Sequence, residues 1–559
     1  MRRLDAAIVR LDPRAAWLLL GLAMFWAALW ILWQGRDLSL AADELFYYAR
    51  LVDDGGAIES HRFGLDYLLA PHNGHLQLGG KLIYEGVFAV FGPDYGVLRG
   101  LELLGILAAV ALLFELTRRR AGAAVALTAS LLVLGMGAAW EPMLWPFDLH
   151  TVYALAFGLG ALVALELAGR RAEVAACVLL VASVLMIEVG LAFVVGAGIL
   201  IAGGPRRRAR AWIVLVPVAL YAGWWAWARR FDQGEIMLSN LSQLPADAFD
   251  SLTAVLAALT GLYGHAPDVY PSLVGPDGGA KVLAVVALIA LTAFAIRARP
   301  GVWFWAFVGT LLTYWAFIGL AARPPDSSRY MLVGAIAVLL VGAEALRSRR
   351  YLGPVALALL AVFCVALPAG LAKIADGREQ QLVDAVSSRT QYAMLELARE
   401  RVDRGYQPQS DPVVLAAGPP PFGGLRAGDY FPAADRIGPL GFDLDVVRAL
   451  DDLYRRVADA TLAQALGLSP APAEAPERGS ACRPPAASPV EIGAGSVYVR
   501  STSGAATALM LGRFADAPSL EIGSLEPGRW YVLRIPADSA RDRWRLAAAG
   551  PIAICAPSA

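Results

Sequence analysis

Charge is scarce in this chain. Only 17% of its 559 residues are charged, whereas 57% are hydrophobic, and the mean hydropathy is +0.54. A soluble protein of this length needs more charge to cover its surface, so the composition indicates a membrane protein. Basic and acidic residues balance at 48 each, which removes the electrostatic basis for a nucleic-acid partner.

Cysteine is rarer still. The chain has four cysteines, too few for a disulfide scaffold. Cys482 and Cys555 bracket the C-terminal region and could close a disulfide in an oxidising compartment. The sequence contains no internal repeat, which argues against architectures built from matched halves.

Long apolar runs are abundant by contrast. A transmembrane helix needs roughly 20 apolar residues, or ~17 at the short end. Runs of near-spanning length are Ala15–Trp33, Val97–Leu116, Ala121–Trp140, Thr151–Leu167, Val174–Ala202, Ala211–Ala228, Val282–Ile296, Val302–Leu320, Tyr330–Ala345 and Tyr351–Ile374. The run Val174–Ala202 is too long for one ordinary helix and carries Glu188 at its middle. It is either one tilted helix or two short helices that meet at Glu188.

The short connections between these runs are rich in arginine. They include Arg118–Arg120, Arg170–Arg171, Arg206–Arg210, Arg297 with Arg299, and Arg347 with Arg349 and Arg350. The positive-inside rule places all of them in the cytoplasm, which requires Val174–Ala202 to cross twice. We therefore expect about eleven transmembrane helices in a bacterial-type plasma (inner) membrane. The N-terminus lies in the cytoplasm and the C-terminal region lies outside.

The composition divides the chain into four parts. We predict a transmembrane domain over 1–374 with a first external loop at 34–96, an extracytoplasmic helical and irregular segment over 375–468, a linker rich in Pro and Ala over 469–489, and a small β-rich domain over 490–559. Short alternating runs in the last part predict a β-sandwich. The predicted fold class is a polytopic α-helical membrane protein with an extracytoplasmic α+β region.

The first external loop begins with an acidic pair. In a helix, Asp43 shares a face with Tyr47, and Glu44 shares a face with Tyr48. Such a pair at a membrane surface could supply a general base. It could equally provide an N-cap for an interfacial helix, stabilised by the helix dipole.

Histidines lie further along the same loop. His72 and His75 have the spacing of a metal pair, and with Asp43 or Glu44 they could bind a divalent ion. The stronger interpretation is that Asn73 and Gly74 form a turn and that the rings bind donor phosphate or cap helices. We therefore expect no metal or other cofactor.

A second polar cluster is predicted on the same face. Glu141, Asp148 and His150 belong to one short outside loop, either beside the acceptor or in a tight structural turn. Glu188 is expected to be paired, because an unpaired buried charge is costly in a membrane. It supports either the site or only the helix junction.

The order and sidedness of these features resemble the GT-C glycosyltransferases, which include protein O-mannosyltransferases and aminoarabinose transferases. The matching pieces are an external Asp43-Glu44 after one span, Tyr47-Tyr48, His72-Asn73-Gly74-His75, Lys81, Tyr84, Phe91-Gly92-Pro93 before Leu98-Arg99, Ile187 to Leu191 at a helix junction, and Ser328 to Leu332 opening a late helix. The resemblance covers about Ala15–Ile374. The C-terminal region matches no family that we can assign.

The resemblance implies transfer of a sugar from a polyprenyl-phosphate donor to an extracytoplasmic glycan, lipid or protein, with inversion at the anomeric carbon. Asp43 would be the base, with Glu44 as a second acid. Arg329 would bind the leaving phosphate, because its planar fork matches phosphate oxygens. Further donor-side candidates are Arg323, Lys81, His72, His75 and Tyr330. Arg329 could instead be an interfacial anchor at a helix end.

Two other classes of function remain open from the sequence. A transporter or flippase would place polar residues near the midplane in matched halves, whereas the candidates here gather at the outer face. A membrane-anchored glycan-binding or assembly protein without catalysis would act through its external β-domain, and Asp43 and Arg329 would then be dispensable.

Overall fold

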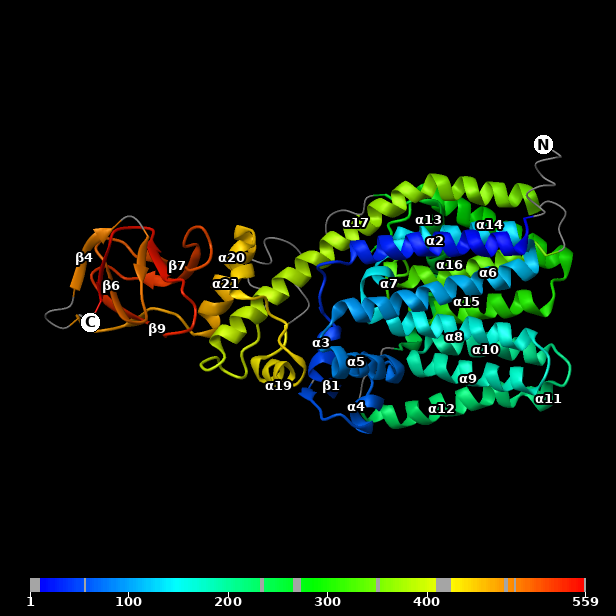
Figure 1. Cartoon of the computed structure of the whole chain (residues 1–559), viewed down its shortest axis with the longest axis horizontal. Coiled ribbons are helices and arrows are strands. Elements are labelled where there is room, and N and C mark those ends of the chain that lie inside the picture. The colour runs from blue at the N-terminus through cyan, green and yellow to red at the C-terminus, as the bar shows by residue number, and fades with distance from the viewer. Residues whose placement is uncertain are drawn as a thin grey trace. The chain divides into compact units, whose positions relative to one another are not determined.

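A computed structural model of the whole chain shows its architecture (Figure 1). The structure describes residues 11–54, 57–231, 236–264, 273–347, 352–408, 424–476, 481–486 and 489–556. The chain forms two compact units. The first consists of Met1–Asp37 and Arg50–Gln381, and the second of Leu38–Ala49 and Leu382–Ala559. The stretch that carries Asp43 and Glu44 therefore belongs to the unit that contains the C-terminal region.

The first unit is a bundle of long helices that run side by side (Figure 1). Its helices are α2 (Pro13–Gln34), α4 (Leu65–Leu69), α5 (Leu78–Phe91), α6 (Tyr95–Leu134), α7 (Trp140–Leu144), α8 (Leu149–Glu166), α9 (Arg170–Met186), α10 (Val189–Ala202), α11 (Arg207–Arg210), α12 (Trp212–Ala228), α13 (Leu244–Thr260), α14 (Gly278–Ala298), α15 (Val302–Leu320), α16 (Ser328–Ala345) and the first part of α17 (Leu352–Ala398). Strands β1 (Leu51–Asp54) and β2 (Ala57–Ser60) form an antiparallel hairpin.

Among the described residues, seven helices are long and apolar enough to cross a membrane: α2, α6, the segment Pro146–Glu166 that includes α8, α14, α15, α16 and α17. The chain is thus a multi-pass membrane protein. Large apolar side chains on α2 and α14, such as Trp26 and Ile289, are more than half exposed, as expected for helices that face lipid. The predicted count of about eleven spans stays a prediction.

Two junctions explain how the predicted runs map onto helices. The run Val174–Ala202 is two helices, because α9 ends at Met186 and α10 begins at Val189. Conversely, α6 contains two predicted runs that meet at Gly122, whose φ of 83° breaks the helix. An L-residue other than glycine adopts that backbone conformation only at a cost.

Some predicted boundaries differ from the structure. Helix α17 has 47 residues and continues from the last predicted span into the predicted extracytoplasmic segment. Gly370 and Gly377 do not end it, because they allow close packing against Gly135 and Trp140. Helix α6 ends at Leu134, before the predicted end at Trp140, and Trp140 opens the separate helix α7. Helix α13 lies in a stretch that none of the predicted runs covers, and it buries its apolar face within the unit.

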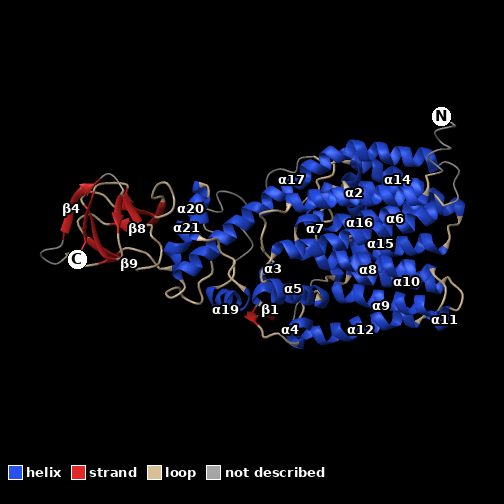
Figure 2. Cartoon of the chain, in the orientation of Figure 1, coloured by secondary structure: helices blue, strands red, loops and turns tan. Residues whose placement is uncertain are grey.

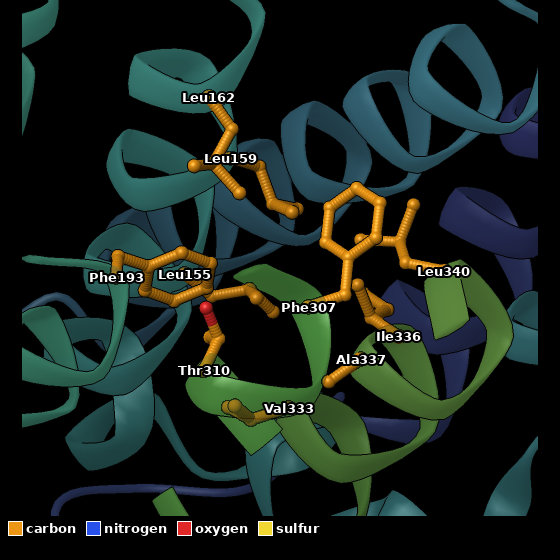
Figure 3. A pocket seen from close by; sticks show the side chains of 10 residues that line it. All are labelled: Leu155, Leu159, Leu162, Phe193, Phe307, Thr310, Val333, Ile336, Ala337 and Leu340. Carbon is orange, nitrogen blue, oxygen red and sulfur yellow. The ribbon is translucent and has the colours of Figure 1, made fainter. Parts of the chain in front are cut away.

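The helices of the first unit pack closely at their centre. Figure 3 shows the small apolar cavity where α8, α10, α15 and α16 meet. Its volume is about 10 Å³, enough for about one water molecule. Glycines make this packing possible: a Cβ on Gly158 would lie 2.2 Å from Cγ of Phe193. The close packing fixes the starts of α10 and α16, where site residues lie.

The second unit combines helices with a β-sandwich. Its elements include α3 (Glu44–Ala49), α19 (Ala427–Ile437), α20 (Leu444–Ala449) and α21 (Asp452–Ala465). The hydroxyl of Tyr48 donates to the carbonyl of Gly438 at 2.8 Å, and Arg436 donates to the carbonyl of Tyr48 at 2.6 Å. Tyr48 also stacks on Tyr430. These contacts join α3 to α19.

The sandwich contains all strands after β2 (Figure 2). One sheet has the order β5 (Val490–Ile492), β10 (Trp544–Ala548), β7 (Thr507–Gly512), β8 (Leu520–Leu525); the other has the order β3 (Ala471–Pro472), β9 (Trp530–Ile535), β6 (Gly495–Ser501), β11 (Ile552–Ala556), β4 (Ala481–Ala486). All named pairs are antiparallel. Strands β3 and β4 lie in the stretch that was expected to be a linker. This stretch is extended there because β3 pairs with β9 and β4 pairs with β11.

A disulfide and a buried carboxylate tie the sandwich together. Cys482 of β4 and Cys555 of β11 are register partners and are disulfide-bonded. Asp459 of α21 accepts hydrogen bonds from the backbone N–H groups of Phe514 and Ala515 at 2.7 and 3.1 Å. Burial raises the pKa of Asp459 to about 6 despite these bonds. Helix α21 is thereby fixed to the edge of the sandwich.

Candidate active site

Polar side chains of the first unit gather where α5, α7, α10 and α16 begin. In Figure 1, α5 and α7 lie at the end of the bundle opposite α11. We call this group the outer cluster, because the sequence predicts that it lies on the outer face of the membrane. Its members are His72, His75, Gln77, Glu141, Trp145, His150, Glu188, Ser328 and Arg329.

A tight turn presents the two histidines. His72 and His75 exchange backbone hydrogen bonds of 3.1 and 2.9 Å. Asn73 and Gly74 between them have φ values of 49° and 76°. Asn-Gly is the preferred pair for a two-residue turn in which both residues have positive φ. The turn predicted from Asn73-Gly74 is therefore present, and it places both rings close to the start of α5.

The broken helix between α9 and α10 supplies a partner for one of these rings. Oε1 of Glu188 lies 2.9 Å from Nδ1 of His75. Both side chains are about one-fifth exposed, so the pair is largely shielded from solvent but accessible to a ligand. A carboxylate on one ring nitrogen fixes the tautomer and raises the basicity of the imidazole. The pair therefore has the form of an acid–base group.

His150, at the start of α8, is buried beside this pair. Its Nε2 lies 3.3 Å from Nε2 of Gln77, the residue that precedes α5. Its ring also contacts Phe147 edge-to-face. His150 interacts electrostatically with His72, His75 and Arg329, so the histidines and the arginine share one environment.

The opening of α16 depends on a carboxylate from another helix. Glu141 of α7 accepts a hydrogen bond from the backbone N–H of Arg329 at 3.0 Å and one from the Ser328 hydroxyl. The first N–H groups of a helix have no partner within it, so Glu141 caps α16 in trans. The same carboxylate pairs with Nη2 of Arg329 at 3.5 Å. The guanidinium also lies 5.1 Å from the centroid of Trp145.

This arrangement leaves Arg329 partly accessible. About 31% of its side chain is exposed, whereas Glu141 is buried. Tyr314 of α15 interacts electrostatically with Asp148, Glu188 and Arg329, which connects the arginine side of the cluster to the His75–Glu188 side. The cluster thus combines an oriented, reachable cation with an acid–base pair at the end of an apolar bundle.

Arg99 positions the loop that carries Glu141. Its guanidinium is buried and donates to the carbonyls of Leu144 and Ile31, each at 2.8 Å. The hydroxyl of Tyr95 donates to the same Leu144 carbonyl at 3.2 Å. A Cβ on Gly35 would lie 1.8 Å from Cζ of Arg99, so Gly35 makes room for this side chain.

Lys81 is buried too deeply to bind a phosphate at the surface. It is 1% exposed and donates to the carbonyls of Tyr67 and Ala70 at 2.8 and 2.7 Å. Its ammonium also lies 4.9 Å from the centroid of the Tyr67 ring. Burial lowers the pKa of Lys81 to about 7. These contacts make Lys81 a support for the segment around α4.

His72 is also buried. Desolvation, with a smaller contribution from the Lys81 charge, lowers the pKa of His72 to about 3. The ring is therefore neutral at physiological pH. Among the described residues, no group of three or more His, Cys, Asp or Glu side chains is arranged to hold a metal ion.

The remaining candidates lie in both units. Asp148 belongs to the short 3-10 helix Pro146–Asp148 and is buried, and Arg323 follows α15 and is partly exposed. Tyr330 accepts a hydrogen bond at its carbonyl from Tyr314. In the second unit, Glu44 is fully buried and accepts a hydrogen bond from the backbone N–H of Ala41 at 3.1 Å, while Asp43 is partly exposed. Glu44 therefore binds the turn that opens α3.

Sequence reasoning did not single out Gln77, Trp145, Ser328 or Arg99 as site residues. Arg99 has a recognisable signal, because it is a lone arginine near the start of an apolar run, where an unpaired charge is costly. Gln77 carries no such signal, and Ser328 stands only in a motif quoted for the family resemblance. Their contacts with His150 and Glu141 appear only in the tertiary structure.

Comparisons with known proteins give one finding about the fold. No family model matches the chain, and no curated protein matches it. A solved structure described as "Crystal Structure of ArnT from Cupriavidus metallidurans bound to Undecaprenyl phosphate" is similar over 68% of this chain and 80% of that chain, with 14% identity and a TM-score of 0.40. This similarity by itself assigns no activity to the chain.

Proposed function

We propose that the protein is a membrane glycosyltransferase of the GT-C kind that uses a polyprenyl-phosphate sugar donor. The observation that carries the proposal is the capped, partly exposed Arg329 beside the His75–Glu188 pair, at the end of an apolar bundle. A lipid-linked phosphate would place its tail along the apolar helices and its phosphate at the helix ends. Arg329 is suited to such a phosphate because Glu141 and Trp145 orient its fork.

In the proposed reaction, an acceptor hydroxyl oxygen attacks the anomeric carbon of the donor. The bond from that carbon to the phosphate oxygen breaks, and polyprenyl phosphate leaves with the bonding electrons. The acceptor proton passes to a base. Direct attack inverts the configuration at the anomeric carbon. Arg329 stabilises the negative charge that develops on the leaving phosphate, which is where such a cation has most effect on the rate.

Two groups are proposed as the base, from independent arguments. Asp43 is the base that the family resemblance implies, and it lies in the second unit. His75 is the base that the geometry of the first unit supports, because the Glu188 carboxylate is within hydrogen-bond distance of its Nδ1. A variant at each position separates the two assignments.

The experiment uses the full-length protein in lipid nanodiscs with a panel of radiolabelled polyprenyl-phosphate sugars. Donor hydrolysis and transfer to added glycan, lipid or protein acceptors are measured. We expect Arg329→Ala to lower the rate about 10²- to 10³-fold for one donor. We expect either Asp43→Asn or His75→Gln to abolish turnover, which identifies the base. Arg208→Ala, an exposed arginine of α11, is the matched control and should keep the wild-type rate.

The alternatives make different predictions in the same assay. A transporter or flippase would move the donor across a vesicle membrane without consuming it. A binding or assembly protein would show no dependence on Arg329 or on either base. If no donor is consumed with any acceptor and every variant behaves like wild type, the glycosyltransferase assignment is wrong.

A further inference from the structure

A polar cavity lies at the end of the first unit opposite the outer cluster. It measures about 410 Å³ and is lined by Arg119, Arg120, Leu165, Glu166, Trp303 and Arg347. These residues come from α6, the last turn of α8, the first turn of α15 and the residues that follow α16. The cavity therefore lies where several membrane helices end, which is the level of lipid headgroups.

The lining is built around a buried ion-pair network. Arg120 is 2% exposed and pairs with Glu166 at 2.5 Å and with Glu344 at 2.9 Å. Its guanidinium lies 4.5 Å from the ring centroid of Trp303. Arg119 pairs with Glu166 at 2.9 Å. The network also includes Glu115, which pairs with Arg119 at 2.7 Å and with Arg118 at 2.8 Å. It fixes the wall of the cavity and leaves a net charge of +1, because its four arginines face three glutamates, Glu115, Glu166 and Glu344.

Two of these arginines remain reachable. The side chain of Arg347 is 54% exposed and that of Arg119 is 31% exposed. Arg347 pairs with Glu344 through Nη1 at 3.1 Å, and that glutamate is shared with Arg120. Reachable guanidinium groups at the mouth, over a rigid polar wall, are suited to phosphate oxygens.

We propose that this cavity binds the headgroup of an anionic phospholipid from the adjacent leaflet, which the positive-inside rule identifies as the cytoplasmic one. Arg119 and Arg347 bind the phosphate, Glu166 accepts a hydrogen bond from a headgroup hydroxyl, and the indole of Trp303 packs at the interface. Basic pockets between membrane helices on the cytoplasmic side are a recognised setting for anionic lipid headgroups. The site stands independently of the proposed glycosyltransferase activity.

The volume and charge favour a lipid over other ligands. A cavity of about 410 Å³ accommodates a glycerophosphate group together with ordered water. Leu165 and Trp303 give the lining apolar surface, and both side chains are partly exposed. The arginines would thus bind the phosphate of a lipid while its acyl chains stay in the bilayer.

The experiment measures lipid retention by native mass spectrometry on the full-length protein released from detergent micelles. Phosphatidylglycerol, phosphatidylcholine and inorganic phosphate are added in separate titrations. We expect retention of phosphatidylglycerol in preference to phosphatidylcholine, and no comparable retention of inorganic phosphate. Arg347→Gln should weaken phosphatidylglycerol binding about fivefold. Arg347→Lys should retain part of the affinity.

Arg208→Gln removes one exposed charge elsewhere at the same end of the bundle and serves as the matched control. It should leave the affinity unchanged. Equal losses in Arg347→Gln and Arg208→Gln would show general electrostatic attraction and overturn the site. Equal binding of inorganic phosphate would identify a free-anion site instead of a lipid site. Absence of preferential phosphatidylglycerol retention by the wild type would also overturn the proposal.

Discussion

The two ends of the first unit carry their charges on different kinds of backbone. At the arginine-rich end, Arg120 bridges Glu166 and Glu344 from regular helices. At the outer end, Glu188 lies in a helix break and His75 lies in a turn. Buried pairs between regular helices fix how those helices pack. Partly exposed pairs on irregular backbone leave polar groups accessible to a ligand, which is the common arrangement of functional sites.

The largest expected effect tests the structural role of the arginine-rich end. Arg120→Met should cost about 3–5 kcal/mol of unfolding free energy, because it leaves two carboxylates buried without their main cation. Arg347→Met should cost only about 0–1 kcal/mol, because its side chain is half exposed and its ion pair is screened by solvent. Denaturant unfolding in mixed micelles measures both. Similar losses for the two variants would contradict the distinction between buried and peripheral arginines.

A smaller effect is expected at the outer end. Glu141→Ala removes the cap of α16 and should destabilise the protein by about 1 kcal/mol. It should also lower donor turnover roughly 10- to 100-fold, because Arg329 loses its orientation. Glu141→Gln keeps an oxygen that can accept a hydrogen bond from the Arg329 N–H. It should therefore lose less stability and less donor turnover than Glu141→Ala. Turnover and thermal stability are measured on the same preparations, and identical behaviour of Ala and Gln would rule out the capping argument.

The last expected effect is a pH dependence at the outer end. The folded pKa of His72 is about 3, below its ordinary value of about 6.5. Below pH 6.5 the unfolded chain therefore binds a proton that the folded ring does not bind. The free energy of unfolding should therefore decrease as pH falls from about 6.5 toward 3, by up to ~1.4 kcal/mol per pH unit from this residue.

Melting temperatures at pH 7.5 and pH 5.0 test this dependence. His72→Gln should show a smaller drop between the two pH values than wild type does. His61→Gln, which changes an exposed histidine of the same loop region, should retain the wild-type drop. If both variants flatten the pH dependence equally, burial of His72 is not its cause.

Much of the fold could be predicted from local pattern. The apolar runs correspond to helices, and the break at Glu188 and the turn at Asn73-Gly74 follow from charge placement and turn chemistry. The linker prediction differed because Pro and Ala predict loop locally, whereas pairing with β9 and β11 makes strands of β3 and β4. The continuation of α17 was missed because composition changes along it while its helical backbone does not.

The candidate site was less accessible to sequence reasoning. The sequence singled out Glu141, Glu188, His75 and Arg329, but it did not pair them. Glu141 was expected either beside the acceptor or in a tight structural turn, and in the structure it caps α16 and pairs with Arg329. Lys81 was expected at donor phosphate, whereas it binds two backbone carbonyls. The residue type limits the chemical roles that a side chain can have, and its neighbours in the fold decide which of these roles it takes.

The sequence by itself determined the membrane character of the chain, the helical runs, the arginine-rich connections and the sandwich strands after residue 490. These features depend on composition and on periodicity over a few turns. Only the tertiary structure decided that Asp43 and Glu44 belong with the C-terminal region and that Glu141 meets Arg329. The last two residues are 188 positions apart. Their contact depends on how α7 and α16 pack, and helix packing is set by the sum of many weak contacts that no local pattern records.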